Sequence, residues 1–205
     1  MSWVATKALI EAGEGGDSQH VRMVALFDNE EIGSLSTMGA DSDLLPTAMK
    51  RIWTALGGTE ASYEPALKRS FVVSADMAHA CHPTYSFKHE VNHRPAFSKG
   101  LVIKQNANMR YATTMATSMV IKLASRIAEV PIQEFVVKND SPCGSTIGNM
   151  VSAKLGIPCV DVGIPQLSMH SIREVAHVAD LDSTVHLFVT LFQQYAKISS
   201  MIDLD

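Results

Sequence analysis

Several features that define other protein classes are missing from this 205-residue chain. No apolar stretch reaches the roughly 18 residues of a membrane-spanning helix. The chain does not open on a basic region followed by an apolar block, as a secretory signal does. It has no cluster of lysine and arginine, and its net charge is −4. We therefore expect no membrane partner, no nucleic-acid partner and a cytoplasmic location.

Cysteine is also scarce. Cys81, Cys143 and Cys159 are an odd number, are widely spaced and form no C-x-x-C pair. This usage predicts reduced and mostly buried thiols in an intracellular protein. The remaining composition, 46% hydrophobic and 19% charged, is that of an ordinary globular domain, and at this length one domain is expected.

The most informative stretch is an apolar run that ends abruptly in acids. Residues 21–27 predict a buried strand, and Asp28, Glu30, Glu31 and then Gly33 follow it directly. In an α/β sheet, ligands bind at the carboxyl ends of strands. Adjacent glutamates there repel each other unless a cation lies between them or one is protonated. The pattern suits metal-assisted hydrolysis, although solvated turn residues or helix caps would give the same letters.

The rest of the chain alternates between strand and helix patterns, which predicts an α/β fold with a mostly parallel sheet. Further strands are expected at 70–76, 101–104, 134–138 and 158–162, and helices at 3–12, 41–56, 112–129, 145–155, 168–178 and 183–199. Residues 77–99 show no period and predict a structured loop. In the helix at 112–129, the four-residue spacing of Met115, Met119, Leu123 and Ile127 predicts a core-facing stripe.

Potential metal ligands follow three of these segments. They are the acids after residue 27, Asp76 and His170. Carboxylates with one imidazole suit zinc, and mixed ligation of this kind occurs in two-metal hydrolytic sites. His170 alone could equally be a capping or core residue. The histidines of the loop are either further ligands or the polar lining of a mouth or subunit contact: His79, His82, His89 and His93. A serine hydrolase using Ser168 or Ser171 lacks the G-x-S-x-G elbow.

Five ordered motifs resemble the aspartyl aminopeptidase family, which includes the vacuolar aminopeptidase of yeasts. The resemblance runs from about residue 21 to the C-terminus. It rests on the segments 28–34 (DNEEIGS), 74–83 (SADMAHACHP), 88–95 (KHEVNHRP), 139–148 (NDSPCGSTIG) and 166–174 (QLSMHSIRE).

The resemblance implies a three-layer sandwich like that of zinc exopeptidases. It also implies an enzyme with two zinc ions that removes N-terminal Asp or Glu from peptides. It implies that Glu30 is the general base and that Glu31 and His170 bind one zinc ion. Asp76 would bind the other. It further implies that Lys104 meets the acidic side chain of the substrate, where a cation explains the preference by charge pairing. Without the resemblance, Lys104 could be a plain edge-strand charge.

The resemblance also implies that His82 and the turn at 141–148 line the substrate pocket, and that the protein forms homo-oligomers. Two family features have no match here: an upstream histidine ligand, and a bridging aspartate in an Arg-Leu-Asp-Asn context. Neither Glu14, Asp17 nor His20 replaces them.

We therefore expect residues 1–205 to form an N-terminally incomplete, C-terminal portion of the catalytic domain. The alternative is a non-catalytic fragment or assembly subunit of such an enzyme. A vacuolar location is the alternative to a cytoplasmic one.

Overall fold

The computed structural model describes residues 1–14, 20–202 and 204. Its helices are α1 (Ser2–Ala12), α2 (Leu44–Ala55), α3 (Glu60–Lys68), α4 (Met115–Ala128), α5 (Gly148–Leu155), α6 (Val178–Ser199) and the 3₁₀ helix η1 (Pro83–Lys88). Its strands are β1 (Val72–Ala75), β2 (Ala78–His79), β3 (Leu101–Gln105), β4 (Ile132–Val136), β5 (Cys159–Gly163), β6 (Pro165–Leu167) and β7 (Val175–Ala176).

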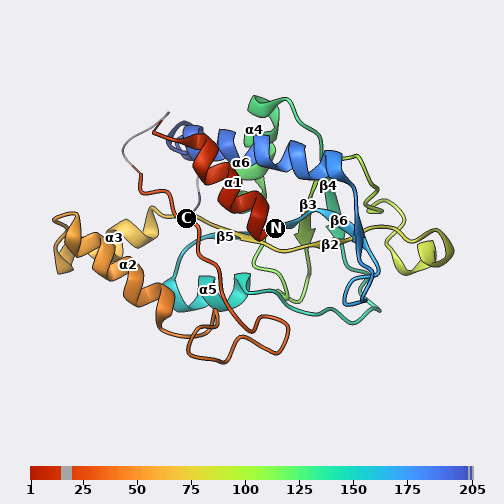
Figure 1. Ribbon diagram of the computed structural model, residues 1–205, viewed down its shortest axis with the longest axis horizontal. Helices are drawn as coiled ribbons and strands as arrows, with labels where there is room; N and C mark the ends of the chain where they lie inside the picture. The colour runs from red at the N-terminus through yellow and green to blue at the C-terminus, as the bar shows by residue number, and fades with distance from the viewer. Residues whose placement is uncertain (15–19, 203, 205) are drawn as a thin grey trace.

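The central sheet has four strands in the order β1-β5-β3-β4. The pairs β1–β5 and β3–β4 are parallel, whereas β3 and β5 run antiparallel. A smaller sheet, β2-β6-β7, continues beyond it, with β2 and β6 parallel. Helices α1, α4 and α6 cover one face of the central sheet, and α5 lies across the other (Figure 1). The expected three-layer α/β architecture with a mostly parallel sheet is confirmed.

Alternation along the strands assigns side chains to the two faces. Leu101 and Ile103 of β3 belong to the larger core, together with Val160 and Val162 of β5 and buried residues of α1, α4 and α6. Val102 faces the other way and packs with Phe135 and Tyr111. Lys104 has the same parity as Val102, so the pattern places its side chain on the face away from α1, α4 and α6.

The buried stripe of α4 differs from the predicted one. Thr114 caps the helix by accepting a hydrogen bond from the Thr117 backbone N–H. The residues facing the core are Thr117, Ser118, Val120, Ile121, Ala124, Ser125 and Ala128. Met115, predicted to lie in the core, is 87% exposed, and Ile127 is 42% exposed. Smaller side chains form the stripe because α4 packs closely against α6 and the sheet.

Two predicted elements are wrong. Residues 21–27 form no strand and pair with none of the strands of either sheet; Val21 and Leu26 remain 61% and 57% exposed. Residues 168–178 are not a helix. Ser168 and His170 have φ angles of 60° and 67°, outside the helical region. Residues 168–174 form the loop of an antiparallel hairpin between β6 and β7, and β7 itself follows.

Further local features concern the first loop, the cysteines and the helices. The glycine-rich sequence of residues 13–17 predicts a loop. The structure has a turn at Gly13 and Glu14, and the remainder of this stretch lies outside the described residues. All three cysteines are free thiols, and Cys159 is buried. Within the described part of the chain, no helix is both long and apolar enough to cross a membrane. Helix α3, which carries Pro65 in its interior, was not predicted.

Candidate functional site

The acidic motif lies on a tight turn rather than on a strand end. Asn29 takes a left-handed φ of 60° and its side chain donates a hydrogen bond to Ser36 Oγ. The Gly33 N–H donates to the Glu30 carbonyl, and the Ser34 N–H donates to that of Asn29. These bonds close the turn, so Glu30 and Glu31 are presented side by side with local backbone support.

Asp76 and Lys104 meet where β1 ends. The Lys104 ammonium lies 3.4 Å from Asp76 Oδ2 and donates a 3.0 Å hydrogen bond to the Met77 carbonyl. It also lies 5.2 Å from the centre of the Tyr111 ring, within cation–π range. Lys104 is only 2% exposed, so these three partners account for an otherwise costly buried cation.

His170 reaches the acidic turn from the β6–β7 loop. Its Nε2 lies 3.0 Å from Glu31 Oε2. Its backbone N–H donates a 2.6 Å hydrogen bond to Glu174 Oε1, which fixes the left-handed backbone at this position. The structure thus brings together two residues that are 139 positions apart in the sequence, as their predicted role as ligands of one ion requires.

The charges around Glu30 include those of the other predicted site residues. Partial burial is the largest cause that raises the pKa of Glu30, and the carboxylates of Asp76 and Glu31 raise it further. Lys104 and His170 act in the opposite direction. Glu30, Glu31, Asp76, Lys104 and His170 therefore share one electrostatic environment. A carboxyl group whose pKa is raised toward neutrality is the kind of group that can accept and return a proton.

This pKa shift predicts how stability depends on pH. Glu30 has a folded-state pKa above its ordinary value of 4.5, so its favourable contribution is complete below pH 4.5 and is lost as the pH rises through the raised pKa. We expect Glu30→Gln to raise the thermal midpoint at pH 7 by about 1–2 °C and to leave it unchanged at pH 4, since solvent screens a partly exposed group.

Thermal unfolding of both proteins between pH 4 and pH 8 measures this effect. Glu64→Gln, at an exposed position of α3, is the matched control and should show no such divergence. A Glu30→Gln protein less stable than the parent at pH 7 would contradict the prediction.

His79 and His82, the two histidines of the segment 74–83, have different surroundings. His82 caps η1, with its Nδ1 accepting a hydrogen bond from the Thr84 N–H, and its ring packs against Tyr85. His79 lies nearer the candidate site. Desolvation lowers the pKa of His79 first, followed by the positive charges of Lys104, His89 and His170. The sequence does not show which of the two histidines lies nearer the candidate site. The structure separates them, because His79 is on β2 and His82 caps η1.

Tyr111 is a site residue that sequence reasoning missed. It is 7% exposed, packs against Val102 and Phe135, and lies under the Lys104 ammonium. Burial raises the pKa of Tyr111, and a hydrogen bond with Cys143 raises it further. It follows Arg110 in a polar loop, and no spacing or pattern in the sequence relates it to Lys104.

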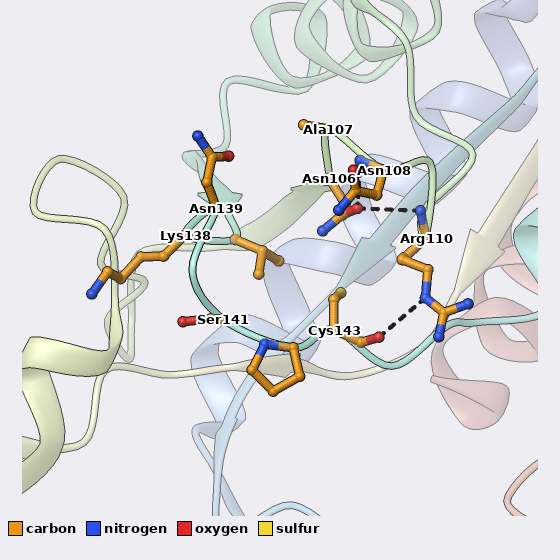
Figure 2. A pocket seen from close by; sticks show the side chains of 10 residues that line it. Asn106, Ala107, Asn108, Arg110, Lys138, Asn139, Ser141 and Cys143 are labelled. Atoms are coloured by element: carbon orange, nitrogen blue, oxygen red, sulfur yellow. Dashed lines mark hydrogen bonds between the residues drawn. The ribbon is translucent and has the colours of Figure 1, made fainter.

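A cavity of about 250 Å³ lies beyond the ends of β3 and β4 (Figure 2). Its lining comes from the two loops that follow these strands and consists of Asn106, Ala107, Asn108, Arg110, Val137, Lys138, Asn139, Ser141, Pro142 and Cys143. The Arg110 Nε–H bonds to the Cys143 carbonyl and so ties the two loops together. None of the clustered acids lines this cavity, so the candidate site is an open surface of the chain and not this cavity.

The donor atoms fit zinc in kind but not in number. Carboxylates and an imidazole are normal zinc ligands, and Glu31 and His170 are already adjacent. However, across residues 1–14, 20–202 and 204, no three His, Cys, Asp or Glu side chains are grouped so that they could hold a metal ion. A catalytic zinc ion usually takes three protein ligands and a water. The described residues therefore present part of a zinc donor set.

The fold and this partial donor set are those of a metallopeptidase, and comparison with known proteins agrees. The family model described as aminopeptidase I zinc metalloprotease (M18) matches residues 1–192. The chain belongs to this family.

Relatives and solved structures support the assignment. A probable aspartyl aminopeptidase of Ricinus communis is 47% identical over 209 residues, covering 100% of this chain and 43% of that protein. The aspartyl aminopeptidase of Caenorhabditis elegans is 45% identical, covering 97% of this chain and 43% of that protein. Ape4 in a cryo-EM complex with Nbr1 has a TM-score of 0.94 at 44% identity, covering 100% of this chain and 39% of that one.

A crystal structure of prApe1 has a TM-score of 0.91 at 30% identity, with 98% of this chain and 43% of that one covered. The chain thus spans less than half the length of the relatives that it matches.

Proposed function

We propose that this chain forms part of the catalytic domain of a zinc-dependent aminopeptidase that releases N-terminal Asp or Glu from peptides. The observations that support the proposal are the contact of His170 with Glu31 and the contact of the buried Lys104 with Asp76. The charges of all four residues also act on the pKa of Glu30. The name shared by the relatives, aspartyl aminopeptidase, supports the acidic specificity.

Each clustered residue has a role in this proposal. Glu31 and His170 would hold one zinc ion and Asp76 would hold a second. Bound zinc would lower the pKa of water and polarise the peptide carbonyl. Glu30 accepts the proton of the attacking water and returns it to the leaving amine, a task that suits its raised pKa.

In the proposal Lys104, which lies on β3 beside the end of β1, selects the substrate. Lys104 pairs with the side-chain carboxylate of the N-terminal residue, because its ammonium is desolvated and held by Tyr111. In the proposal His82 and the turn at 141–148 line the pocket. The positive charges of Lys104 and His170 both lower the pKa of His79, which supports adding His79 to the lining.

The incomplete donor set favours a second candidate, in which the chain by itself is a non-catalytic subunit or fragment. Under both proposals we expect a homo-oligomer, since a structural neighbour of 27% identity and TM-score 0.84 is described as the mApe1 dodecamer of S. cerevisiae. Additional zinc donors would then come from another polypeptide segment. The cytoplasmic location remains a prediction.

Hydrolysis of an N-terminal aspartyl chromogenic substrate by the purified chain tests the first candidate against the second. We expect turnover with added zinc only if the donor set is completed, and it should be abolished by a chelator and be weaker on the matching alanyl substrate. Turnover that resists chelation would contradict the zinc proposal.

If the folded chain gives no turnover with zinc, the second candidate holds for the chain alone. The same assay then moves to a chimaera in which this chain replaces the matching 43% of the Ricinus communis relative. An active chimaera would show that these residues serve a complete site.

A further inference from the structure

Asp161 is a completely buried acid that the proposed mechanism does not use. It lies on β5 with 0% exposure. Its Oδ2 accepts a 2.6 Å hydrogen bond from the Ala112 N–H, and its Oδ1 accepts a 2.5 Å bond from Thr146 Oγ1. Its backbone N–H donates to Thr113 Oγ1 at 2.9 Å. A buried carboxyl group with this many directed bonds is costly to place and fixes the groups that it binds.

The bonds of Asp161 join two loops that are far apart in the sequence. Ala112 follows β3 and Thr146 lies between β4 and α5, within the turn at 141–148. The chain leaves room for the carboxyl group at Gly148, where an added Cβ would lie 2.4 Å from Asp161 Oδ2. Gly148 has no left-handed φ angle, so contact with Asp161 is what requires a glycine there.

The same bonds lead to Lys104. Ala112 directly follows Tyr111, whose ring lies 5.2 Å from the Lys104 ammonium. On the sheet, Ile103 of β3 lies opposite Val162 of β5, so Lys104 and Asp161 are the next residues along these paired strands. A shift of the Ala112 backbone therefore moves the aromatic ring against which Lys104 is held.

We propose that Asp161 is a positioning residue that fixes Tyr111 against Lys104 and thereby sets the position of the cation that recognises an acidic substrate side chain. The substrate part of this inference rests on the proposed function. The positioning part rests only on the contacts of Asp161, Tyr111 and Lys104.

Asp180 provides a matched control for a merely structural role. It is also a buried acid, 1% exposed, and it accepts hydrogen bonds from the Ser98 and Gly100 N–H groups at 2.8 and 2.7 Å. It lies in the first turn of α6, and the hydrogen bonds that its carboxylate accepts come from the segment before β3. Asp161→Asn and Asp180→Asn should therefore both lower the thermal midpoint, but only the first should disturb the lysine.

The test uses NMR of the full chain, with the Lys104 side-chain resonance assigned by its loss in Lys104→Arg. The ring current of Tyr111 is expected to shift this resonance away from the random-coil position of a lysine. We expect Asp161→Asn to move it toward the random-coil position and Asp180→Asn to leave it in place. Gly148→Ala keeps the acid but crowds it, so it should give the same displacement and serves if Asp161→Asn does not fold.

An unchanged Lys104 resonance in the folded variants, or an equal change in Asp180→Asn, would overturn the inference. Binding of L-aspartate and of its neutral isostere L-asparagine is then compared by titration. We expect Asp161→Asn to reduce the preference for aspartate about tenfold relative to Asp180→Asn. A parent chain without that preference, but with the displaced resonance, would refute the proposed substrate role of Lys104 and leave the positioning role intact.

Discussion

Glu30→Gln is expected to lower kcat by a factor of about 10²–10⁴ in the chimaera, with KM changed only a few-fold. Glutamine has nearly the same shape as glutamate but cannot accept the proton of the attacking water. The raised pKa of Glu30 arises from burial and from the neighbouring Asp76 and Glu31, so the function that is lost depends on this cluster of acids. The measurement is steady-state hydrolysis of the aspartyl substrate at saturating zinc.

Glu31→Gln separates the base from the metal ligand. Glu31 contacts His170, and in the proposal both bind zinc. Its replacement should weaken zinc binding, so that activity recovers in part when zinc is raised, whereas no zinc concentration should restore Glu30→Gln. A Glu30→Gln chimaera that keeps more than about a tenth of the parent kcat would refute the assignment of the base.

Much of the fold was predictable because its strands are short apolar runs bounded by turn residues. The strand that ends at Asp76 and the one that begins at Leu101 were placed to within two residues. Residues 21–27 have the same apolar character but form no strand, because a strand also needs a partner for its backbone hydrogen bonds. Composition alone does not reveal whether that partner is present.

Candidate site residues could be recognised from the sequence where acids or a histidine follow directly on an apolar segment or a turn. Glu30, Glu31, Asp76 and His170 were singled out as acids or a histidine next to turns; the structure puts Glu31 and His170 in contact, and the roles of all four remain predictions. Position 170 was nevertheless expected on a helix, because the left-handed φ angles of Ser168 and His170 occur at residues other than glycine.

Tyr111 and Asp161 were not predictable in the same way. Each acts through contacts with residues distant in the sequence, such as that of Tyr111 with the Lys104 ammonium and those of Asp161 with the Ala112 N–H and Thr146 Oγ1. Such contacts depend on the register between β3 and β5, which antiparallel pairing sets only once the chain has folded. The register between these two strands cannot be predicted from a single sequence.

Lys104→Met is expected to remove the preference for acidic N-termini. In the chimaera, kcat/KM for the aspartyl substrate should fall roughly 10- to 100-fold relative to that for the alanyl substrate, which corresponds to the loss of one charge-assisted hydrogen bond. Methionine fills a similar volume among Val102, Tyr111 and Met77, so the packing is largely kept. Paired assays of the two substrates give the ratio directly.

Control variants separate loss of substrate selection from damage to the fold around Lys104. Lys104 donates a hydrogen bond to the Met77 carbonyl and lies near Asp76, so its replacement could also disturb the end of β1. Such damage would lower activity on the aspartyl and alanyl substrates to the same extent. Lys104→Arg keeps the charge and should keep the preference for aspartate, while Lys99→Met, at an exposed position, should change neither rate. If Lys104→Met lowers both substrates equally, the cation supports the fold of the site and does not select the substrate.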